Sequence, residues 1–504
     1  MFAASVSSVP AVCSPEYPYA GTRNPLSKVY LFVKDLFHQI VHQHPLISSS
    51  AALALLLAIR KFRYHPLVHK HAAALQVVSL AILLRIGKEW SHLPTALIFQ
   101  PILSDLGIYA DFRKGMNKEV YVPRECWYRG EKIASLSYQL QEKRKIPVLE
   151  TFTSDPWKRG FAQGVLMGDQ LIHLYQHVMR PMKFLLAMQG GDITGHKLAQ
   201  NTQNMTFPAE FQSEIEGLSV GVQEWSKKSG IKSTLSIEQL RSIHVLADTY
   251  KQILFSLGCS TVVLKRGEDL CAFRHLDWVA FQKLGRYMYE AIHSGKDIET
   301  GKIWRTRALT FPGFVGMLNG TNGALTLIVN ECSRVSHTEG VPYNLFVGKL
   351  LRQASSVAEV DVAITKISLL ARNLLPASSF HLIAFDSRGE VKNYQFYAKP
   401  GHLVVNRTCD KQGVLIVTNH AIDQRFGGII PGTQSSATSE LRYRLIQRAL
   451  NAHLNTTTPL VDVLKQALKH DPVNGKATIA SIIYHGGAIS YAFDNCKAGN
   501  YWKP

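Results

Sequence analysis

The spacing of hydrophobic and polar positions divides the chain into a helical part and a later part rich in strands. Apolar residues recur at helical spacing over residues 155–188, 211–230 and 236–257. Ser236 and Glu238 add N-terminal helix signals to the third of these segments. After Gly258 the apolar runs become short and are separated by turn residues, which is typical of strands.

Beyond Gly258 the pattern predicts a series of antiparallel hairpins. Glycine or asparagine marks their turns, as at Gly267, 319–323 and Gly389. The expected hairpins span residues 259–278, 308–332, 379–397 and 476–494, and an apolar strand at 413–420 and a helix at 439–454 precede the last of them. Helices followed by hairpins indicate an α+β or layered fold rather than a doubly wound one.

These elements predict one α+β domain over residues 131–504. Its helical part is expected at 131–258 and its β part at 259–504. Residues 127–147 are polar and change in character from what precedes them, so we expect them to link an N-terminal region to this domain.

Residues 1–130 are expected to form a helical N-terminal region, which is basic and apolar in composition. Its apolar runs, 46–59 and 72–84, are each shorter than the roughly 20 residues that span a bilayer. Between Asp35 and Glu89 there are only basic charges, namely Arg60, Lys61, Arg63, Lys70, Arg85 and Lys88. Two interpretations stay open: buried helices of an accessory domain, or a basic hairpin lying on an anionic membrane. The first residues lack the features of a signal peptide, and the compartment stays open.

Composition excludes several classes of protein. Of 504 residues, 46% are apolar and 18% charged, so the chain can bury a core and is not expected to be disordered or collagen-like. Seven cysteines without a CxxC pair predict no structural zinc, and we expect no metal or other cofactor. A net charge of +19 fits an ordinary solvated surface or an anionic membrane. Motifs that read nucleic acid are missing among the charges, so no nucleic-acid partner is expected.

Ser219 lies in a GxSxG sequence, Gly217 to Gly221, that formally matches a nucleophile elbow. Such an elbow needs an apolar strand before the serine and a helix after it. The residues before Ser219 are polar, and Ile215, Leu218 and Val222 continue one helical stripe. We therefore interpret Ser219 as an ordinary helical residue.

Cys259 is a stronger candidate for a nucleophile because of the hairpin that it begins. Arg274 and Asp277 end the second strand of that hairpin, so they return beside the start of the first strand without any long-range assumption. A guanidinium near a thiol favours the thiolate, and a carboxylate can orient a nearby amine.

At these residues the chain resembles the cysteine N-terminal-nucleophile (Ntn) hydrolases, in particular acid ceramidase, N-acylethanolamine acid amidase and the penicillin acyltransferase group. The resemblance covers about residues 150–504. Besides the Gly-Cys-Ser start and the Arg-x-Leu-Asp hairpin end, five segments agree in order: DPWKRGFAQG, EIEGLSVGV, PGFVGMLNGTNGALTLIVNE, VTNH and SELRYR. His275 stands where the family commonly has asparagine, and the acidic residues after Asn419 depart from the ceramidase pattern.

The resemblance implies a four-layer αββα sandwich that cleaves itself between Gly258 and Cys259. The sulfur of Cys259 would be the nucleophile and its new α-amine the base, since an α-amine titrates near pH 8. The two processed chains would stay associated.

The resemblance also implies that Arg274, Asp277 and Asn419 are catalytic residues and that Glu331 and Arg442 are supporting ones. Arg274 and Asp277 would hold the thiol, the amine and the substrate carbonyl in register. Asn419 would donate its side-chain NH₂ to the oxyanion, an interaction worth roughly 3 kcal/mol. Glu331 would support the site, and Arg442 would pin Asn419 or the amine.

The implied activity is cleavage of the amide bond of an N-acyl compound through a thioester on Cys259. The substrate would be a fatty acyl amide, such as ceramide or an N-acylethanolamine, or an N-acylated amino acid or peptide. Two alternatives stay open: an acyltransferase that moves the acyl group to an amine, and a catalytically inactive relative that binds membranes.

Overall fold

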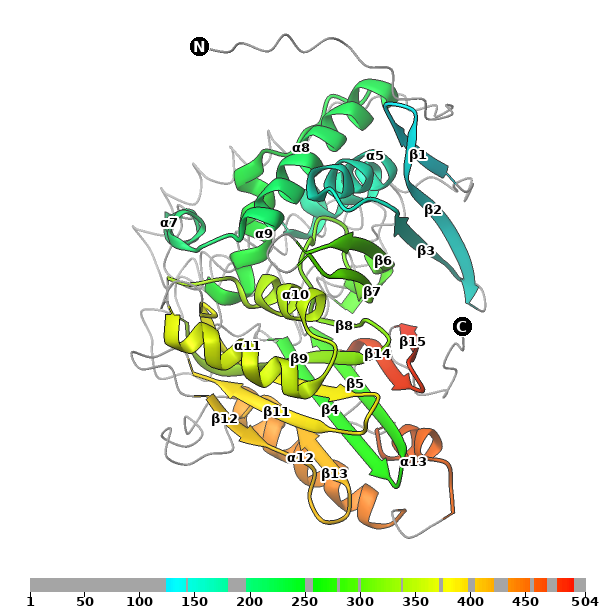
Figure 1. Ribbon diagram of the computed structural model, residues 1–504, viewed down its shortest axis with the longest axis vertical. Helices are drawn as coiled ribbons and strands as arrows, with labels where there is room; N and C mark the ends of the chain where they lie inside the picture. The colour runs from blue at the N-terminus through cyan, green and yellow to red at the C-terminus, as the bar shows by residue number, and fades with distance from the viewer. Residues whose placement is uncertain are drawn as a thin grey trace, which may run out of the picture.

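The computed structural model describes twelve stretches of the chain, and they contain two β-sheets with helices packed around them (Figure 1). These stretches are residues 124–141, 144–179, 196–249, 257–278, 282–297, 301–336, 339–370, 375–397, 404–420, 434–453, 457–468 and 478–493. The apolar runs at 46–59 and 72–84 lie outside the described residues, so the accessory-domain and membrane interpretations of that region stay predictions.

The larger sheet has ten strands in the order β1-β2-β3-β6-β7-β8-β9-β10-β11-β12. All neighbours are antiparallel except β3 and β6, which are parallel. The strands are β1 (Arg124–Tyr128), β2 (Glu131–Gln141), β3 (Arg144–Thr151), β6 (Tyr289–Lys296), β7 (Ile303–Thr310), β8 (Asn319–Thr321), β9 (Leu325–Ser336), β10 (Ser378–Asp386), β11 (Val391–Phe396) and β12 (Val404–Arg407).

The smaller sheet has five antiparallel strands in the order β13-β4-β5-β14-β15. They are β13 (Val414–Val417), β4 (Leu257–Arg266), β5 (Asp269–Trp278), β14 (Thr478–His485) and β15 (Ala488–Phe493). β4 packs against β9 of the larger sheet. Hydrogen bonds also join the sheets directly: among them, Thr261 Oγ1 donates to Asn330 Oδ1 over 2.8 Å, and Asn330 Nδ2 donates to the Val417 carbonyl over 2.8 Å.

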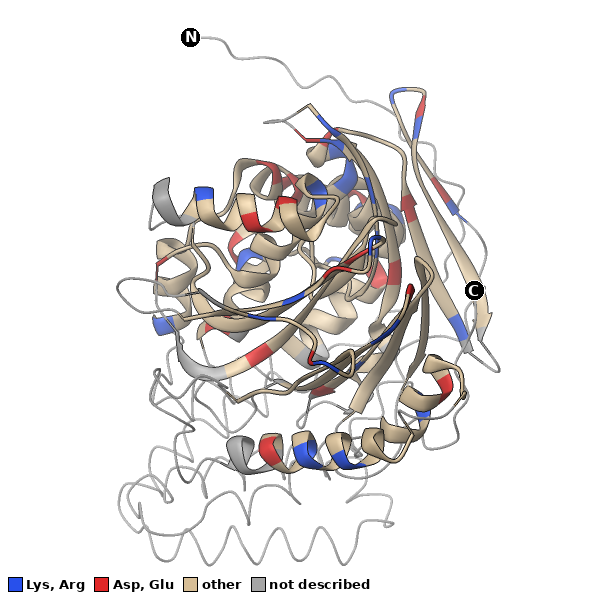
Figure 2. Ribbon diagram, turned by 60° about the horizontal axis from the view of Figure 1, so that its bottom comes forward, with Lys and Arg blue, Asp and Glu red and all other residues tan. Residues whose placement is uncertain are grey.

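Helices cover both sheets. On the larger sheet, α5 packs on β1, β2 and β3, α10 packs on β7 to β10, and α11 packs on β10. On the smaller sheet, α12 and α13 contribute Ile446 and Leu464 to a core with Val262, Phe273 and Ile416. Figure 2 shows α12 lying along that sheet and carrying both acidic and basic residues. The helices are α5 (Pro156–Leu174), α7 (His196–Asn204), α8 (Ala209–Ser229), α9 (Ile237–Thr249), α10 (Tyr343–Gln353), α11 (Val357–Leu370), α12 (Gln434–Asn451) and α13 (Leu460–Leu468), with a π-helix at Tyr175–Met179 and a 3₁₀-helix at Gln282–Tyr287.

The α+β class predicted from the sequence is confirmed by this arrangement. The predicted hairpins at 259–278, 379–397 and 476–494 are present. The hairpin predicted at 308–332 differs, because residues 319–321, expected at its turn, form β8 and pair with β9, while 311–318 are not a strand. Helices α5, α8 and α9 lie within the predicted helical segments to within two residues at their starts. Among the helices of the described residues, none has the length and apolar character needed to cross a bilayer.

Residues 124–151 differ from the expectation, because they form three strands instead of a link. The predicted boundary after residue 130 falls at the turn between β1 and β2, which pair antiparallel, so β1 belongs to the sheet. Ile133, Leu136 and Leu149 are buried against Phe161 and Val165 of α5. The apolar cover that makes these polar segments into strands comes from a helix later in the chain, which local patterning does not reveal.

Helices α5 and α8 cross closely because glycines meet at the contact. A Cβ added to Gly164 would lie 2.5 Å from the Leu218 carbonyl oxygen, and one added to Gly160 or Gly217 would collide with the opposite backbone. The glycines of the GxSxG sequence therefore serve helix packing. Ser219 lies inside α8 and donates to the Leu235 carbonyl over 2.8 Å, as its interpretation as a helical residue requires.

A buried ion cluster joins α8 to α5 and α10. Glu214 accepts from Arg159 Nη2 at 3.3 Å and from Arg352 Nη2 at 3.2 Å, and all three side chains are at most 3% exposed. Trp304 lies beneath both guanidinium groups, at 5.0 Å and 4.8 Å. Burial raises the pKa of Glu214, but the two arginines outweigh burial and hold the pKa below its ordinary value.

We expect Glu214→Gln to lower the free energy of unfolding by about 3 kcal/mol or more, because it leaves Arg159 buried without its carboxylate. Urea denaturation followed by circular dichroism measures this. The matched control is Glu224→Gln on the same helix, where an exposed pair with Lys227 predicts a change of about 0.5 kcal/mol or less. Equal effects of the two variants would show that the buried cluster contributes no more than a surface pair.

Candidate active site

The hairpin formed by β4 and β5 brings three candidate residues together. In its register Gly258 lies opposite Asp277, and Cys259 lies opposite Leu276. Arg274 Nη2 donates to Cys259 Sγ over 3.5 Å. The hairpin therefore places Arg274 and Asp277 beside Cys259, as the sequence predicted.

The alternation of the strands separates this site into two sides. Cys259 and Arg274 face the larger sheet, where Arg274 Nη1 donates to the Leu318 carbonyl at 3.1 Å. Ser260 and Asp277 face the opposite way and meet Arg442 of α12. The thiol thus lies between the sheets, while the carboxylate lies on the helix side of the smaller sheet.

Two residues distant in sequence hold the main chain of Cys259. The Cys259 N–H donates to Asn419 Oδ1 over 2.8 Å. Arg442 donates to that same oxygen at 2.6 Å, to the Cys259 carbonyl at 2.5 Å and to Ser260 Oγ at 2.6 Å. Its guanidinium also lies 4.0 Å from the Asp277 carboxylate. Both polar main-chain groups of Cys259 are thereby fixed.

Asn419 is oriented differently from its predicted role. Its Nδ2 donates to the main-chain carbonyl of Glu331 over 2.8 Å, and its oxygen faces the Cys259 amide. The assignment of the two amide atoms follows from the partners, because Arg442 and the Cys259 N–H can only donate. The amide group of Asn419 therefore holds the main-chain nitrogen of Cys259 through its oxygen.

Glu331 contributes through its main chain and through its charge. Its carbonyl fixes Asn419, and its carboxylate is near enough to disfavour ionisation of the thiol. Burial is the largest cause of the raised pKa of the Cys259 thiol, Arg274 opposes it, and Asp277 and Glu331 add to it. Cys259 is only 1% exposed, so the thiol is closed to solvent and its neutral form is favoured.

Asp277 lies directly against the residue that precedes Cys259. A Cβ built on Gly258 would lie 3.1 Å from Asp277 Cβ and 3.4 Å from Oδ2, so glycine allows the close approach. Thr478 Oγ1 donates to Asp277 Oδ1 at 2.7 Å. Burial raises the pKa of Asp277 to about 6, against the opposing effects of Arg442, Thr478 and Arg274.

His275 lies on the far side of β5 from the thiol. Its Nε2 donates to the Leu468 carbonyl at 2.9 Å, which leaves Nδ1 to accept from Ser481 Oγ at 2.7 Å. Burial lowers its pKa to about 4, so the ring is neutral at pH 7. His275 therefore makes its contact with α13, away from Cys259.

Sequence reasoning gave no role to several residues that complete the site. Ser439 Oγ accepts from the Asn419 main-chain N–H at 2.7 Å and bonds to His420 Nδ1 at 2.9 Å. Thr478 contacts Asp277, and Ser260 contacts Arg442. Small hydroxyl side chains carry no pattern that distinguishes such roles, although Ser439 lies within the SELRYR segment.

No model of a known protein family matches this chain, and no curated protein is similar to it. Within the stretches that the structure describes, no three side chains of His, Cys, Asp or Glu gather as a metal site would require.

Proposed function

We propose that this chain is a self-processing Ntn hydrolase that cleaves the amide bond of an N-acyl compound. One observation supports it most: Arg274, Asn419 and Arg442 converge from separate parts of the chain on the sulfur, nitrogen and oxygen of Cys259. Any buried main-chain N–H and C=O needs a partner, but a buried cysteine of purely structural role needs no guanidinium on its sulfur. The two packed sheets with helices around them also fit a four-layer αββα sandwich, which we propose as the fold.

In the proposed processing step, the thiol of Cys259 attacks the carbonyl carbon of Gly258. The C–N bond between the two residues breaks, the nitrogen takes a proton, and Gly258 is left as a thioester on Cys259. Water then cleaves the thioester, which gives a Gly258 carboxylate and a free α-amine on Cys259. Asp277 lies against Gly258, where it can orient the reacting peptide.

In the proposed catalytic cycle, the α-amine of Cys259 accepts the thiol proton and returns it to the leaving amine of the substrate. Asn419 already accepts from the nitrogen that becomes this amine, and Arg442 donates to the same oxygen of Asn419. The acyl group passes to sulfur as a thioester, and water releases it as a carboxylic acid. Arg274 stabilises the thiolate from 3.5 Å in this scheme.

The test is a panel of N-acyl substrates with intact-protein mass spectrometry. We expect at least one of ceramide, an N-acylethanolamine or an N-acyl amino acid to leave its acyl mass on the fragment beginning at Cys259 and to release free acid. Cys259→Ala should do neither. Appearance of a new amide when an amine is added would identify an acyltransferase, and inertness towards every member would contradict the proposal.

A further inference from the structure

The main chain of Asn419 is held by a side chain of α12. Asn419 lies two residues beyond Val417, where the pairing of β13 with β4 ends. Its main-chain N–H donates to Ser439 Oγ over 2.7 Å. A buried main-chain N–H needs a partner, and Ser439 is itself fully buried, so its hydroxyl serves this N–H where solvent does not reach.

Helix α12 contacts Asn419 at two points. Ser439 holds the main chain, and Arg442, three residues later on the same face of the helix, donates to Asn419 Oδ1 at 2.6 Å. Arg442 also donates to the Cys259 carbonyl. A single helix therefore sets both the backbone and the amide of Asn419 relative to Cys259.

The Ser439 hydroxyl has a second partner, which fixes its direction. While its oxygen accepts from Asn419, its hydrogen is left for His420 Nδ1, 2.9 Å away. Thr418 Oγ1 lies 3.0 Å from the same ring nitrogen. Burial lowers the pKa of His420, so its ring is neutral at pH 7 and Nδ1 can accept.

The position of the Asn419 backbone decides which amide contacts are possible. The last torsion of an asparagine side chain is loosely defined, so its direction depends on its partners. Here Oδ1 accepts from the Cys259 N–H and Nδ2 donates to the Glu331 carbonyl, both at 2.8 Å. A misplacement of about 1 Å in such a group can cost about 10²-fold in rate.

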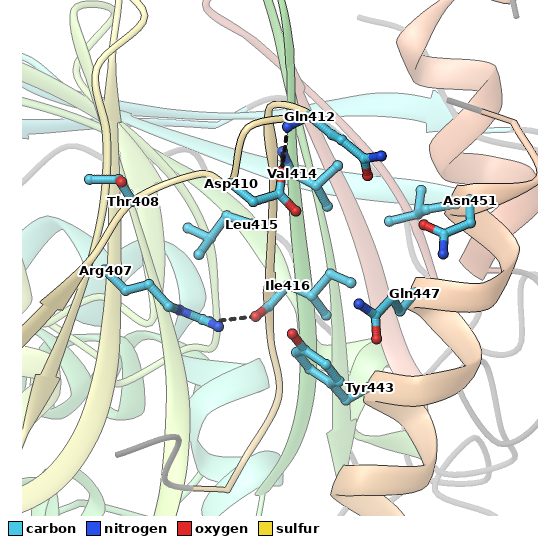
Figure 3. A pocket seen from close by; sticks show the side chains of 11 residues that line it. Arg407, Thr408, Asp410, Gln412, Val414, Leu415, Ile416, Tyr443, Gln447 and Asn451 are labelled. Atoms are coloured by element: carbon cyan, nitrogen blue, oxygen red, sulfur yellow. Dashed lines mark hydrogen bonds between the residues drawn. The ribbon is translucent and has the colours of Figure 1, made fainter. Parts of the chain in front are cut away.

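The later turns of α12 lie in different surroundings. Tyr443, Gln447 and Asn451 line a cavity of about 290 Å³ beside β12 and β13 (Figure 3). Neither Ser439 nor Arg442 is among the residues that line it. A substitution at the exposed Gln447 therefore perturbs the same helix without touching Asn419.

We propose that Ser439 is a positioning residue for amide cleavage. Its hydroxyl fixes the main chain of Asn419, and through it the amide group that holds the Cys259 nitrogen. This inference rests on the proposed function, and it gives Ser439 no contact with the substrate or with the sulfur.

Two rates test this role in Ser439→Ala. Fragment appearance after pulse labelling in cell-free translation measures processing, and acid release from N-lauroylethanolamine measures turnover. We expect each rate to fall at least about ten-fold, with KM within about two-fold of the wild type, because the loss affects the transition state and not substrate binding. Turnover is expressed per active site, counted as acyl-enzyme by mass spectrometry, so a smaller folded fraction does not lower it.

Two control variants test whether the loss is specific to Asn419. Ser481 is equally buried and lies 2.7 Å from His275 Nδ1, so Ser481→Ala removes the same kind of hydroxyl–imidazole bond away from Cys259. Ser481→Ala and Gln447→Ala should keep wild-type rates. Equal losses in Ser439→Ala and Ser481→Ala would indicate a general packing role and overturn the proposal.

A double variant shows whether Ser439 acts through Asn419. In the Asn419→Ala background there is no amide to position, so Ser439→Ala should cost no more than about two-fold further. A loss of stability would appear equally in both backgrounds, so additive losses would overturn the proposal. Wild-type rates in Ser439→Ala would overturn it and leave the proposed function intact, whereas a wild-type protein that neither cleaves itself nor releases acid would contradict both.

Discussion

Purified protein should separate on a denaturing gel into fragments of residues 1–258 and 259–504, whereas Cys259→Ala should remain one chain. The reason is the proposed attack of the Cys259 thiol on Gly258, which a methyl group cannot perform. Arg442 and Asn419 already hold the carbonyl and the N–H of Cys259, so the peptide that would break is fixed in place. N-terminal sequencing of the smaller fragment should begin at Cys259.

A matched control separates loss of chemistry from loss of folding. Cys271 is a buried cysteine of the same hairpin, but it packs into the core against α12 and α13. Cys271→Ala should be processed like the wild type, with a small loss of stability. A wild-type protein that turns over amides fully while uncut would contradict the α-amine mechanism.

The second large effect is expected in Arg274→Ala and Asp277→Asn, each of which should slow both processing and amide turnover by about 10²- to 10⁴-fold. The same two groups position one thiol for both reactions: Arg274 contacts the sulfur, and Asp277 lies against Gly258. Rates of fragment appearance and of acid release measure the two steps separately.

The pH dependence of the processing rate tests the charge of Asp277. If Asp277 had a purely structural role, its protonation would not change this rate. Its pKa is raised to about 6, so the carboxylate is protonated below that pH and charged above it. Only the charged form attracts Arg442 and accepts hydrogen bonds through both oxygens. We therefore expect the wild-type rate to rise through pH 6, and the Asp277→Asn profile to lose this step.

Controls for these variants lie at the other end of the hairpin. Asp269 is exposed and pairs with His485, and Arg266 donates to the Thr458 carbonyl at the surface. Asp269→Asn and Arg266→Ala make the same chemical changes far from Cys259, and they should keep wild-type rates. Wild-type activity in Arg274→Ala or Asp277→Asn, with normal thermal unfolding, would show that these residues do not serve the thiol.

Contacts between residues that are near in sequence could be predicted from the pattern of apolar and turn residues. The hairpin from Cys259 to Trp278 closes on itself, so the pairing of Gly258 with Asp277 follows from a turn at Gly267. Helices α8 and α9 could be predicted from the spacing of apolar residues for a similar reason, since each buries one stripe of apolar side chains. The assignment of Ser219 to a helix rests on the same periodicity.

The strands β1 to β3 could not be predicted from the local pattern. Their sequence is polar, and they become strands because α5 covers Ile133 and Leu149. Helix α5, which covers these strands, lies later in the chain, and the sequence of residues 124–151 does not indicate that it will pack there.

The sequence by itself determined the helices α5, α8 and α9 and the closure of one hairpin on Cys259, because those depend on spacing within a short segment. Only the tertiary structure brought Asn419 and Arg442, 160 and 183 residues away, onto the main chain of Cys259. It also decided that the oxygen of Asn419, and not its NH₂, faces that nitrogen. The physical reason is that such contacts arise from the packing of β13 and α12 on β4, and packing of distant segments is set by the whole core rather than by local periodicity.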